Sequence, residues 1–358
     1  MSESTFTFVE PSVTPIEEHD LTKKVERCYR ICYKSEHHIK QGSENFLKSL
    51  IHHTEGNHHW SPLEHARIVM NMGIVAAGIL AQWEEDRHTR YLDINPRPCL
   101  YKSPKDGRVV ITDSRIIGEH VECKVEGNFR TFIEFLYDDS DKDVGRILAT
   151  RYVIAKELSK HFPIIFPAEL VEELAKKVTH HPEYIKFQFF DSTCQYLGES
   201  GEYRTYHVVT SRDILQELAR HRSLSFSVES TRYCNYAKKG IVFCMPRPYE
   251  WADDLTASGM SHPEALALTK ICKTTSETYL NLIEQGVKPQ VARMVLPGAL
   301  KTEMMLTGTI KQWEAFLKLR DDDAAHPMIR VLAKLIKADL DEYKHSHTVA
   351  LHHEGEQA

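Results

Sequence analysis

The sequence of 358 residues lacks the features that mark several large classes of protein. Its longest apolar stretch, residues 73–81, is far shorter than the roughly 20 apolar residues that a helix needs to cross a bilayer. The first residues lack a basic segment followed by an apolar one, so they do not resemble a signal peptide. No G-x-G-x-x-G segment follows an expected strand, which argues against a Rossmann domain. We therefore expect a cytoplasmic protein that does not enter a membrane.

An excess of basic residues is also missing. The chain has 45 Lys and Arg residues against 51 Asp and Glu residues, for a formal net charge of -6. A surface that binds nucleic acid polymers needs clustered positive charge to neutralise phosphates. We therefore expect no polymer partner, although local basic clusters could still bind a single nucleotide.

The eight cysteines form no C-x-x-C pair, and a chain of this size needs no disulfide framework. None stands beside an activating base motif, so we expect reduced, structural thiols and no cysteine nucleophile. We interpret His52, His53 and His58 as surface residues and expect no metal site.

Apolar periodicity predicts a helix-rich fold of mixed α and β structure. Helices are expected over residues 21–35, 45–53, 129–137, 144–160, 168–178, 211–222, 262–285, 309–320 and 327–343, and strands over residues 66–72, 108–112, 120–124 and 205–209. The first 18 or so residues resemble a polar arm, and no internal repeat is visible. The length allows two average domains or one large domain with an insertion.

The most informative segment has the sequence RHRSLSFSVESTRY, residues 220–233. Consecutive residues of a helix point about 100° apart, so Arg220, His221 and Arg222 suit contact with more than one anionic group. The alternation that follows predicts a strand with Ser225 and Ser227 on one side. A basic helix end followed by a polar loop is the structural alternative, because basic residues favour helix carboxyl ends.

Arg320 continues the apolar stripe of Trp313, Phe316 and Leu317 at helical spacing. A charge on a buried stripe must be paired or serve a ligand. The structural alternative is a salt bridge, either to the acidic residues 321–323 or to another helix.

Arg-His-Arg, followed after seven residues by Ser230 and then by Arg232, resembles the signature of flavin-dependent thymidylate synthases. Three more segments resemble that family: H-W-S-P-L-E-H at residues 59–65, Q-V-A-R-M-V-L-P at residues 290–297, and F-L-K-L-R at residues 316–320. The resemblance covers residues 20–72 and 203–343. It implies an α+β fold, with a helix-rich mixed α/β core formed by residues 1–72 and 201–345, an insertion of unknown role over residues 73–200, and a flexible tail over residues 346–358.

The resemblance also implies an activity. In that family dUMP is methylated to dTMP, methylene-tetrahydrofolate donates the carbon, and FAD reduced by NADPH carries the hydride. Residue by residue, it implies that FAD contacts His59, Ser61, Arg220, His221 and Arg222. Likewise, it implies that dUMP contacts Ser230, Arg232, Arg293 and Arg320.

Arg320 would hold the uracil edge and favour ionisation at N3, and it is therefore the expected catalytic residue. The family assembles as a homotetramer with each FAD site shared between subunits, so we expect the same here.

Several positions depart from the family pattern. Glu217 replaces a Gln, Ser227-Val228 replaces an Asn-Glu pair, and Thr309 and Ala315 stand where many members have asparagines that contact FAD. Two rival functions follow: a catalytically inactive homologue that binds flavin or nucleotide and regulates, and a flavin-dependent methylase of uracil in RNA. The acidic net charge disfavours the second.

Overall fold

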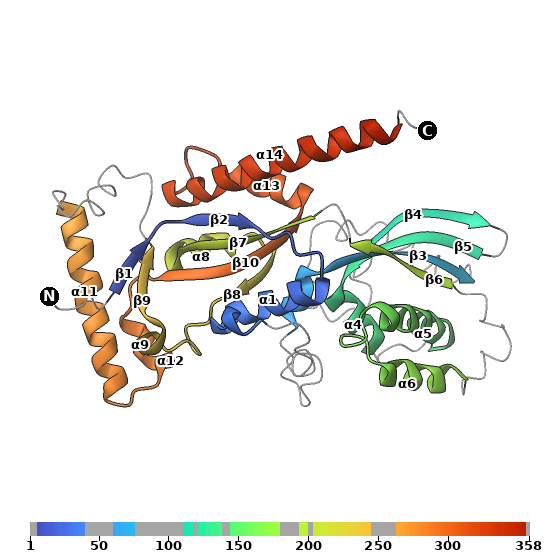
Figure 1. Cartoon of the computed structure of the whole chain (residues 1–358), viewed down its shortest axis with the longest axis horizontal. Coiled ribbons are helices and arrows are strands. Elements are labelled where there is room, and N and C mark those ends of the chain that lie inside the picture. The colour runs from blue at the N-terminus through green and yellow to red at the C-terminus, as the bar shows by residue number, and fades with distance from the viewer. Residues whose placement is uncertain are drawn as a thin grey trace.

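The structure is a computed structural model that describes residues 6–39, 60–75, 110–117, 120–137, 144–179, 193–199, 203–244 and 263–355. These residues form two four-stranded sheets, each covered by helices, and a third sheet of two strands (Figure 1). The expected α+β class is confirmed. Of the helices described, none combines the length and the apolar character needed to cross a membrane.

The first sheet has the order β2-β7-β10-β8, with β2 at Ser12–Pro15, β7 at Tyr203–Ser211, β10 at Lys301–Thr309 and β8 at Ser225–Val228. Its strands are antiparallel. The helices α8 (Arg212–Leu218), α13 (Ile310–Arg320) and α14 (Pro327–Gly355) pack on it. Tyr206, Trp313 and Phe316 are buried in the resulting core, and each aromatic ring contributes a large apolar area.

The second sheet has the order β4-β5-β3-β6, with β4 at Val110–Ile117, β5 at His120–Asn128, β3 at Arg67–Val75 and β6 at Thr193–Glu199. Its core is formed with α4 (Phe129–Tyr137), α5 (Val144–His161), α6 (Ala168–Thr179) and α1 (Leu21–Tyr33). Two short 3-10 helices, η1 (Glu36–His38) and η2 (Ser61–His65), follow α1. Leu63 of η2 is fully buried in this core, directly before β3 begins.

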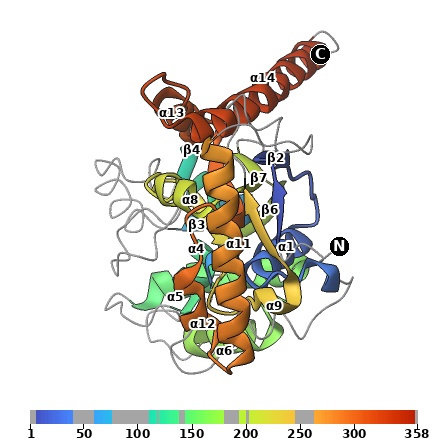
Figure 2. The same cartoon turned by 90° about the vertical axis from the view of Figure 1, so that its left-hand side faces the viewer.

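The small sheet pairs β1 (Phe6–Val9) with β9 (Ile241–Cys244) in parallel. The long helix α11 (Pro263–Glu284) lies at this end of the molecule and faces the viewer in Figure 2. Three short helices complete the region, namely α9 (Tyr236–Lys239), α12 (Pro289–Ala292) and η5 (Arg293–Val295). Tyr236, Phe243 and Tyr279 are buried in its core.

The expected helices are confirmed where the structure describes them, with two changes at their ends. The helix expected over residues 211–222 ends at Leu218, and the one expected to end at residue 343 continues to Gly355. The helix expected over residues 45–53 lies outside the described residues. The expected polar arm is wrong for residues 6–15, since β1 and β2 pair with β9 and β7, strands from the second half of the chain. The division into residues 1–72, 73–200, 201–345 and 346–358 stays a prediction.

Candidate functional site

The Arg-His-Arg segment lies in turns between α8 and β8. Backbone hydrogen bonds from His221 N to Leu218 O and from Leu224 N to His221 O, both 3.0 Å, hold these turns. Leu224 is fully buried in the core of the first sheet, so it fixes the segment to that core. Arg220 and Arg222 are exposed, and neither forms an ion pair with another described residue. Their guanidinium groups are therefore available to anions.

Arg320, at the carboxyl end of α13, meets the middle residue of this segment. Its Nε donates a hydrogen bond to Nε2 of His221 over 2.8 Å. Its Nη1 pairs with a carboxylate oxygen of Glu217 at 2.9 Å, and Nη2 donates to the Glu217 carbonyl over 3.2 Å. We call these three residues the Arg320 cluster. The salt bridge to another helix, one of the two expected alternatives for Arg320, is thus present.

His221 is held as a neutral imidazole in this cluster. Burial and the adjacent Arg320 guanidinium lower the pKa of His221 to about 4. Its ring also packs edge-on against Phe316, with centroids 4.8 Å apart. A neutral ring offers a lone pair on Nε2, and that lone pair is what Arg320 uses. Two of the five N–H donors of Arg320 have no partner among the described residues, and they remain available to a ligand.

A second group of polar side chains follows β8. Arg293, at the start of η5, donates from Nη1 to Oγ1 of Thr231 over 2.6 Å. Ser230 and Arg232 flank Thr231 in the same turn, and Arg232 is exposed with its guanidinium over the Tyr233 ring. We call Ser230, Thr231, Arg232 and Arg293 the Arg293 cluster. The family-like segments at residues 220–233 and 290–297 therefore meet here.

Arg212 is a neighbour of this cluster that the sequence analysis missed. Its Nη1 donates to the Glu229 carbonyl over 3.0 Å and to Thr302 Oγ1 over 3.2 Å. Burial lowers the pKa of Arg212, and Arg293 contributes to the shift. Arg212 begins α8 and Glu217 lies near its end, so roughly 8 Å of helix axis separates the starts of the two clusters. The structure thus places the clusters at opposite ends of α8.

The H-W-S-P-L-E-H segment is described only from Trp60 onward, and His59 lies outside the described residues. Ser61 begins η2 and is partly buried. His65, which ends η2, is fully buried and contacts Thr307 Oγ1 through Nδ1 at 2.7 Å and Ser227 Oγ through Nε2 at 3.0 Å. This histidine was also missed. It joins η2 to β10 and β8, the strands that lead to the two clusters.

The donor set of these residues suits phosphate groups. Exposed guanidinium groups at Arg220, Arg222 and Arg232 pair with phosphate in a bidentate manner. Ser225 Oγ is buried at the start of β8 and has no hydrogen-bond partner among the described residues. The expected residues therefore carry the chemistry that pyrophosphate and phosphate groups require.

The described cysteines are unlike nucleophiles. Burial raises the pKa of Cys32 to about 11 and that of Cys234 to about 11, and it raises the pKa of Cys28 further. A raised pKa keeps the sulfur protonated near neutral pH, and only the thiolate attacks carbon. Within the described ranges, no three His, Cys, Asp or Glu side chains are grouped so that they could hold a metal ion.

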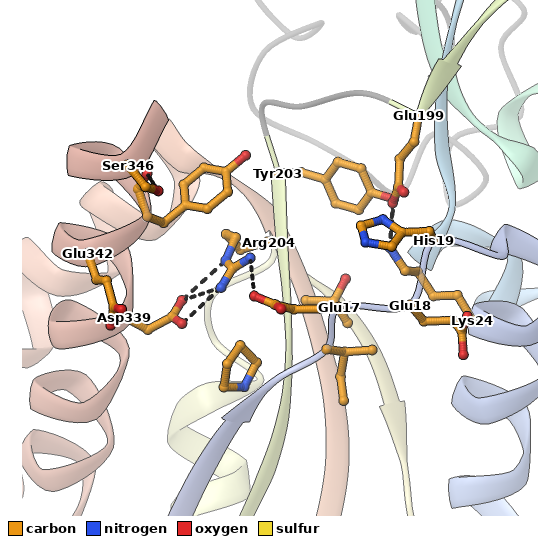
Figure 3. A pocket seen from close by; sticks show the side chains of 14 residues that line it. Glu17, Glu18, His19, Lys24, Glu199, Tyr203, Arg204, Asp339, Glu342 and Ser346 are labelled. Carbon is orange, nitrogen blue, oxygen red and sulfur yellow. Dashed lines mark hydrogen bonds and ion pairs between the residues drawn. The ribbon is translucent and has the colours of Figure 1, made fainter. Parts of the chain in front are cut away.

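A cavity of about 830 Å³ lies elsewhere, between β2, β7, the start of α1 and α14 (Figure 3). Five carboxylates line it, from Glu17, Glu18, Glu199, Asp339 and Glu342. Its two strong cations are already paired, Lys24 with Glu199 and Arg204 with Asp339. This charge balance disfavours anionic ligands. None of the expected site residues that the structure describes lines the cavity.

The chain matches the family described as thymidylate synthase complementing protein over residues 16–178 and 199–343. These two ranges span most of the sequence, so the chain belongs to this family and the expected resemblance is confirmed.

Relatives agree with this assignment. The flavin-dependent thymidylate synthase of Wolinella succinogenes is 32% identical over 153 residues, which cover 43% of this chain and 72% of the relative. The one of Campylobacter jejuni (strain RM1221) is 28% identical over 186 residues, or 51% of this chain and 81% of the relative. A probable flavin-dependent thymidylate synthase of Mycobacterium phage L5 is 32% identical over 133 residues, covering 36% of this chain and only 54% of the relative.

Proposed function

We propose that this protein methylates dUMP to dTMP and uses a flavin as the hydride carrier. The observation that carries the proposal is the contact between Arg320 and His221, which lie 99 residues apart in two segments that resemble the family signature. The names of the relatives, which include flavin-dependent thymidylate synthases, support the same activity. In this proposal the carbon comes from methylene-tetrahydrofolate and the reducing equivalents from NADPH.

The Arg293 cluster would bind dUMP through its phosphate and sugar. Arg232 and Arg293 supply charge, and Ser230 supplies a hydroxyl beside them. Arg320 would lie at the uracil edge, where a fixed positive charge stabilises the negative charge that develops on the ring. The neutral His221 ring would keep the Arg320 guanidinium oriented, because it accepts a hydrogen bond without adding a competing charge.

FAD would contact Arg220, His221 and Arg222, with Ser61 and His59 contributing. When bound, the flavin supplies hydride transfer, which no side chain of the protein can perform. The two clusters lie at opposite ends of α8. In this proposal a neighbouring subunit of a homotetramer completes each site. The exposed Arg220 and Arg222 would then orient the pyrophosphate and exclude water from it.

The test is a tritium-release assay with dUMP labelled at C5, together with the absorption spectrum of the purified protein. We expect a flavin spectrum that dUMP perturbs and release of tritium that needs both the folate and NADPH. Complementation of a thymidine-requiring bacterium gives an independent reading. A colourless protein that neither releases tritium nor complements would overturn the proposal.

The ion pair between Arg320 and Glu217 favours a second candidate function. In it the protein is a catalytically inactive, regulatory homologue that binds flavin or nucleotide. A carboxylate on the Arg320 guanidinium reduces the charge that it offers to a uracil ring. Such a protein would bind dUMP and flavin but release no tritium. The same assay therefore separates the two candidates.

A further inference from the structure

The two four-stranded sheets have the same construction. In each, two long central strands are antiparallel, β7 with β10 in the first sheet and β3 with β5 in the second. In each, the later of these strands is followed directly by a helix and then by a second one, α13 and α14 after β10, and α4 and α5 after β5. The outer strands β8 and β4 pair with β10 and β5 in the same antiparallel sense.

The strand registers agree residue by residue. Arg67 pairs with Asn128 in one sheet, and Tyr203 pairs with Thr309 in the other. Arg67 of β3 is thus the equivalent of Tyr203 of β7, and Asn128 of β5 is the equivalent of Thr309 of β10. Because neither pair of strands has a bulge, this one match at the ends fixes the equivalents of all the other paired residues.

The residues that end these strands have the same roles. Asn128 accepts a hydrogen bond from the backbone N–H of Thr131, and Thr309 accepts one from that of Gln312, so each caps the helix that follows. A glycine precedes each cap, at residues 127 and 308. When Asn128 is aligned with Thr309, Phe132 of α4 corresponds to Trp313 of α13, and both are fully buried.

The edge strands show how the two sheets are joined. β2 precedes β3 in the chain but pairs with β7, whereas β6 precedes β7 but pairs with β3. Residues 12–15 pair with residues 209–206, and residues 193–196 pair with residues 73–70. The alignment of β3 with β7 makes residues 70–73 equivalent to residues 206–209, so the two edge strands occupy the same register. Each sheet therefore contains an edge strand that belongs, by position in the chain, to the other.

A reciprocal exchange of this kind indicates a local two-fold axis. On such an axis equivalent residues touch, and the backbone N–H of Arg67 donates to the hydroxyl of its equivalent, Tyr203, over 3.3 Å. Figure 1 agrees: α13 and α14 lie above the first sheet on the left, whereas α4 and α5 lie below the second sheet on the right.

We propose that the chain contains the same folding unit twice, over residues 12–161 and 193–355, and that it holds one flavin and nucleotide site, whose arginines all belong to the second copy. The first copy is then a built-in, non-catalytic partner. The two matched ranges of the family, residues 16–178 and 199–343, follow the same division. Residues 73–200, predicted to be an insertion, thereby belong partly to the first copy and partly to the exchanged strand of the second.

The sequence of the first copy differs from that of the second at the positions of the site arginines. When the alignment of β3 with β7 is continued without a gap, residues 220–222 correspond to residues 84–86, Glu-Glu-Asp, which precede Arg87 and His88 and lie outside the described residues. When the alignment of β5 with β10 is continued, the position of Arg320 corresponds to Asp139. Carboxylates repel the phosphates that arginines bind, so on this alignment of the sequence only the second copy supplies the arginines of an anionic site.

The first copy nevertheless supports the second. Its η2 segment places the fully buried His65 against Ser227 and Thr307 of the second copy. Lys24 of α1 is paired with Glu199, which also accepts a hydrogen bond from Tyr203. The partner copy is thus part of the scaffold that holds β8 and β10, and a buried polar contact such as His65 fixes one register.

The strand exchange can be tested without any ligand. A protease site is inserted into the full chain between residues 180 and 192, and Val13→Cys and Val208→Cys are introduced at opposed positions of β2 and β7. After oxidation and cleavage, we expect one band of full mass on a non-reducing denaturing gel. The matched control, Val13→Cys alone, has no introduced thiol opposite β2 and should give two bands. Two bands from the first variant and from a second pair, Thr14→Cys with His207→Cys, would overturn the exchange.

The number of sites is tested separately, and this part rests on the proposed function. We expect one flavin and one dUMP per chain, measured by absorbance and by titration calorimetry with the full-length protein. Arg222→Ala should remove all flavin, whereas Asp86→Ala, at the corresponding position of the first copy, should leave one per chain. Two ligands per chain, or half of the flavin remaining in Arg222→Ala, would overturn the single-site proposal. Absence of flavin and dUMP from the unaltered protein would instead contradict the proposed function, while the crosslinking result would stand.

Discussion

The guanidinium of Arg320 and the imidazole of His221 form a hydrogen bond of 2.8 Å in which the arginine Nε donates. The contact joins the last residue of α13 to the turn after α8, and so it brings two distant segments of the chain to one point. Since burial and Arg320 itself lower the pKa of His221 to about 4, the ring stays neutral and can accept this bond at neutral pH. The neutral ring therefore orients the Arg320 guanidinium beside the Arg-His-Arg segment without adding a second positive charge.

Arg320→Ala should keep flavin bound but lose most turnover. Removing one preorganised donor from a developing negative charge lowers kcat by about 10²–10³-fold in enzymes that stabilise oxyanions. Flavin content is measured by absorbance and turnover by tritium release from dUMP. The control is Lys318→Ala, which removes an exposed charge from the same helix. A rate for Arg320→Ala close to that of the control would remove the proposed role.

His221 should make the protein sensitive to acid. Its pKa of about 4 in the folded protein lies below the value of about 6.5 for an unfolded chain, so the unfolded state binds the proton first as the pH falls. The stability that His221 contributes is thus fully present above pH ~6.5 and is lost on acidification towards pH ~4.

This acid sensitivity is checked with His221→Gln, which has an amide that can still accept from Arg320 but does not titrate. We expect the midpoint of urea unfolding to fall less between pH 7 and pH 4.5 in this variant than in the unaltered protein. His37→Gln, at an exposed position, is the control and should behave like the unaltered protein. Equal losses of stability in all three proteins would contradict the assignment.

Arg293→Ala should weaken dUMP binding without removing flavin. The side chain donates to Thr231 over 2.6 Å beside Ser230 and Arg232, so its loss removes a charge and loosens the turn. A hydrogen bond to a charged group contributes about 1.5–3 kcal/mol, which corresponds to an increase in Kd of about 10–150-fold. Titration calorimetry measures the affinity, and Lys288→Ala, exposed before the same short helix, is the control. An unchanged Kd would exclude Arg293 from the nucleotide site.

Most of the helices could be predicted because they depend on local pattern. The helix expected over residues 129–137 is α4, and the stripe of Trp313 and Phe316 correctly identified the buried face of α13. Apolar residues at helical spacing determine which face is buried, whatever the partner is. The partner itself could not be predicted: nothing in the sequence near Arg320 indicates that Glu217 and His221 would bind it.

The repeat and the exchanged strands escaped the sequence analysis for a related reason. A fixed period reveals a repeat, but here the spacing between equivalent strands changes along the chain, since β3 and β7 are closer in sequence than β2 and β6 or β5 and β10. Four-residue strands such as β2 also carry too little pattern to be distinguished from a polar arm. His65 and Arg212 were missed because their roles depend on long-range contacts with residues such as Thr307 and Thr302.

Gly308→Ala should destabilise the fold next to the Arg320 cluster. A Cβ at residue 308 would lie closer to Cδ2 of Leu224 than carbon atoms can approach, and 3.3 Å from Oε1 of Gln312. Leu224 is fully buried and cannot move without disturbing the core, so we expect a loss of about 1–3 kcal/mol in the free energy of unfolding.

The double variant Gly308→Ala with Leu224→Val tests the cause of that loss, since the shorter side chain makes room for the added methyl group. In a urea-unfolding cycle of the four proteins, the two changes should be coupled, with the double variant more stable than the sum of the single effects predicts. Leu224 lies two residues after Arg222, and Gln312 belongs to the capping box of the helix that ends at Arg320. Gly308→Ala should therefore also lower flavin occupancy, and the double variant should restore it. Additive effects on stability would show that the methyl group is accommodated elsewhere, and that the close approach of β10 to Leu224 does not position the site.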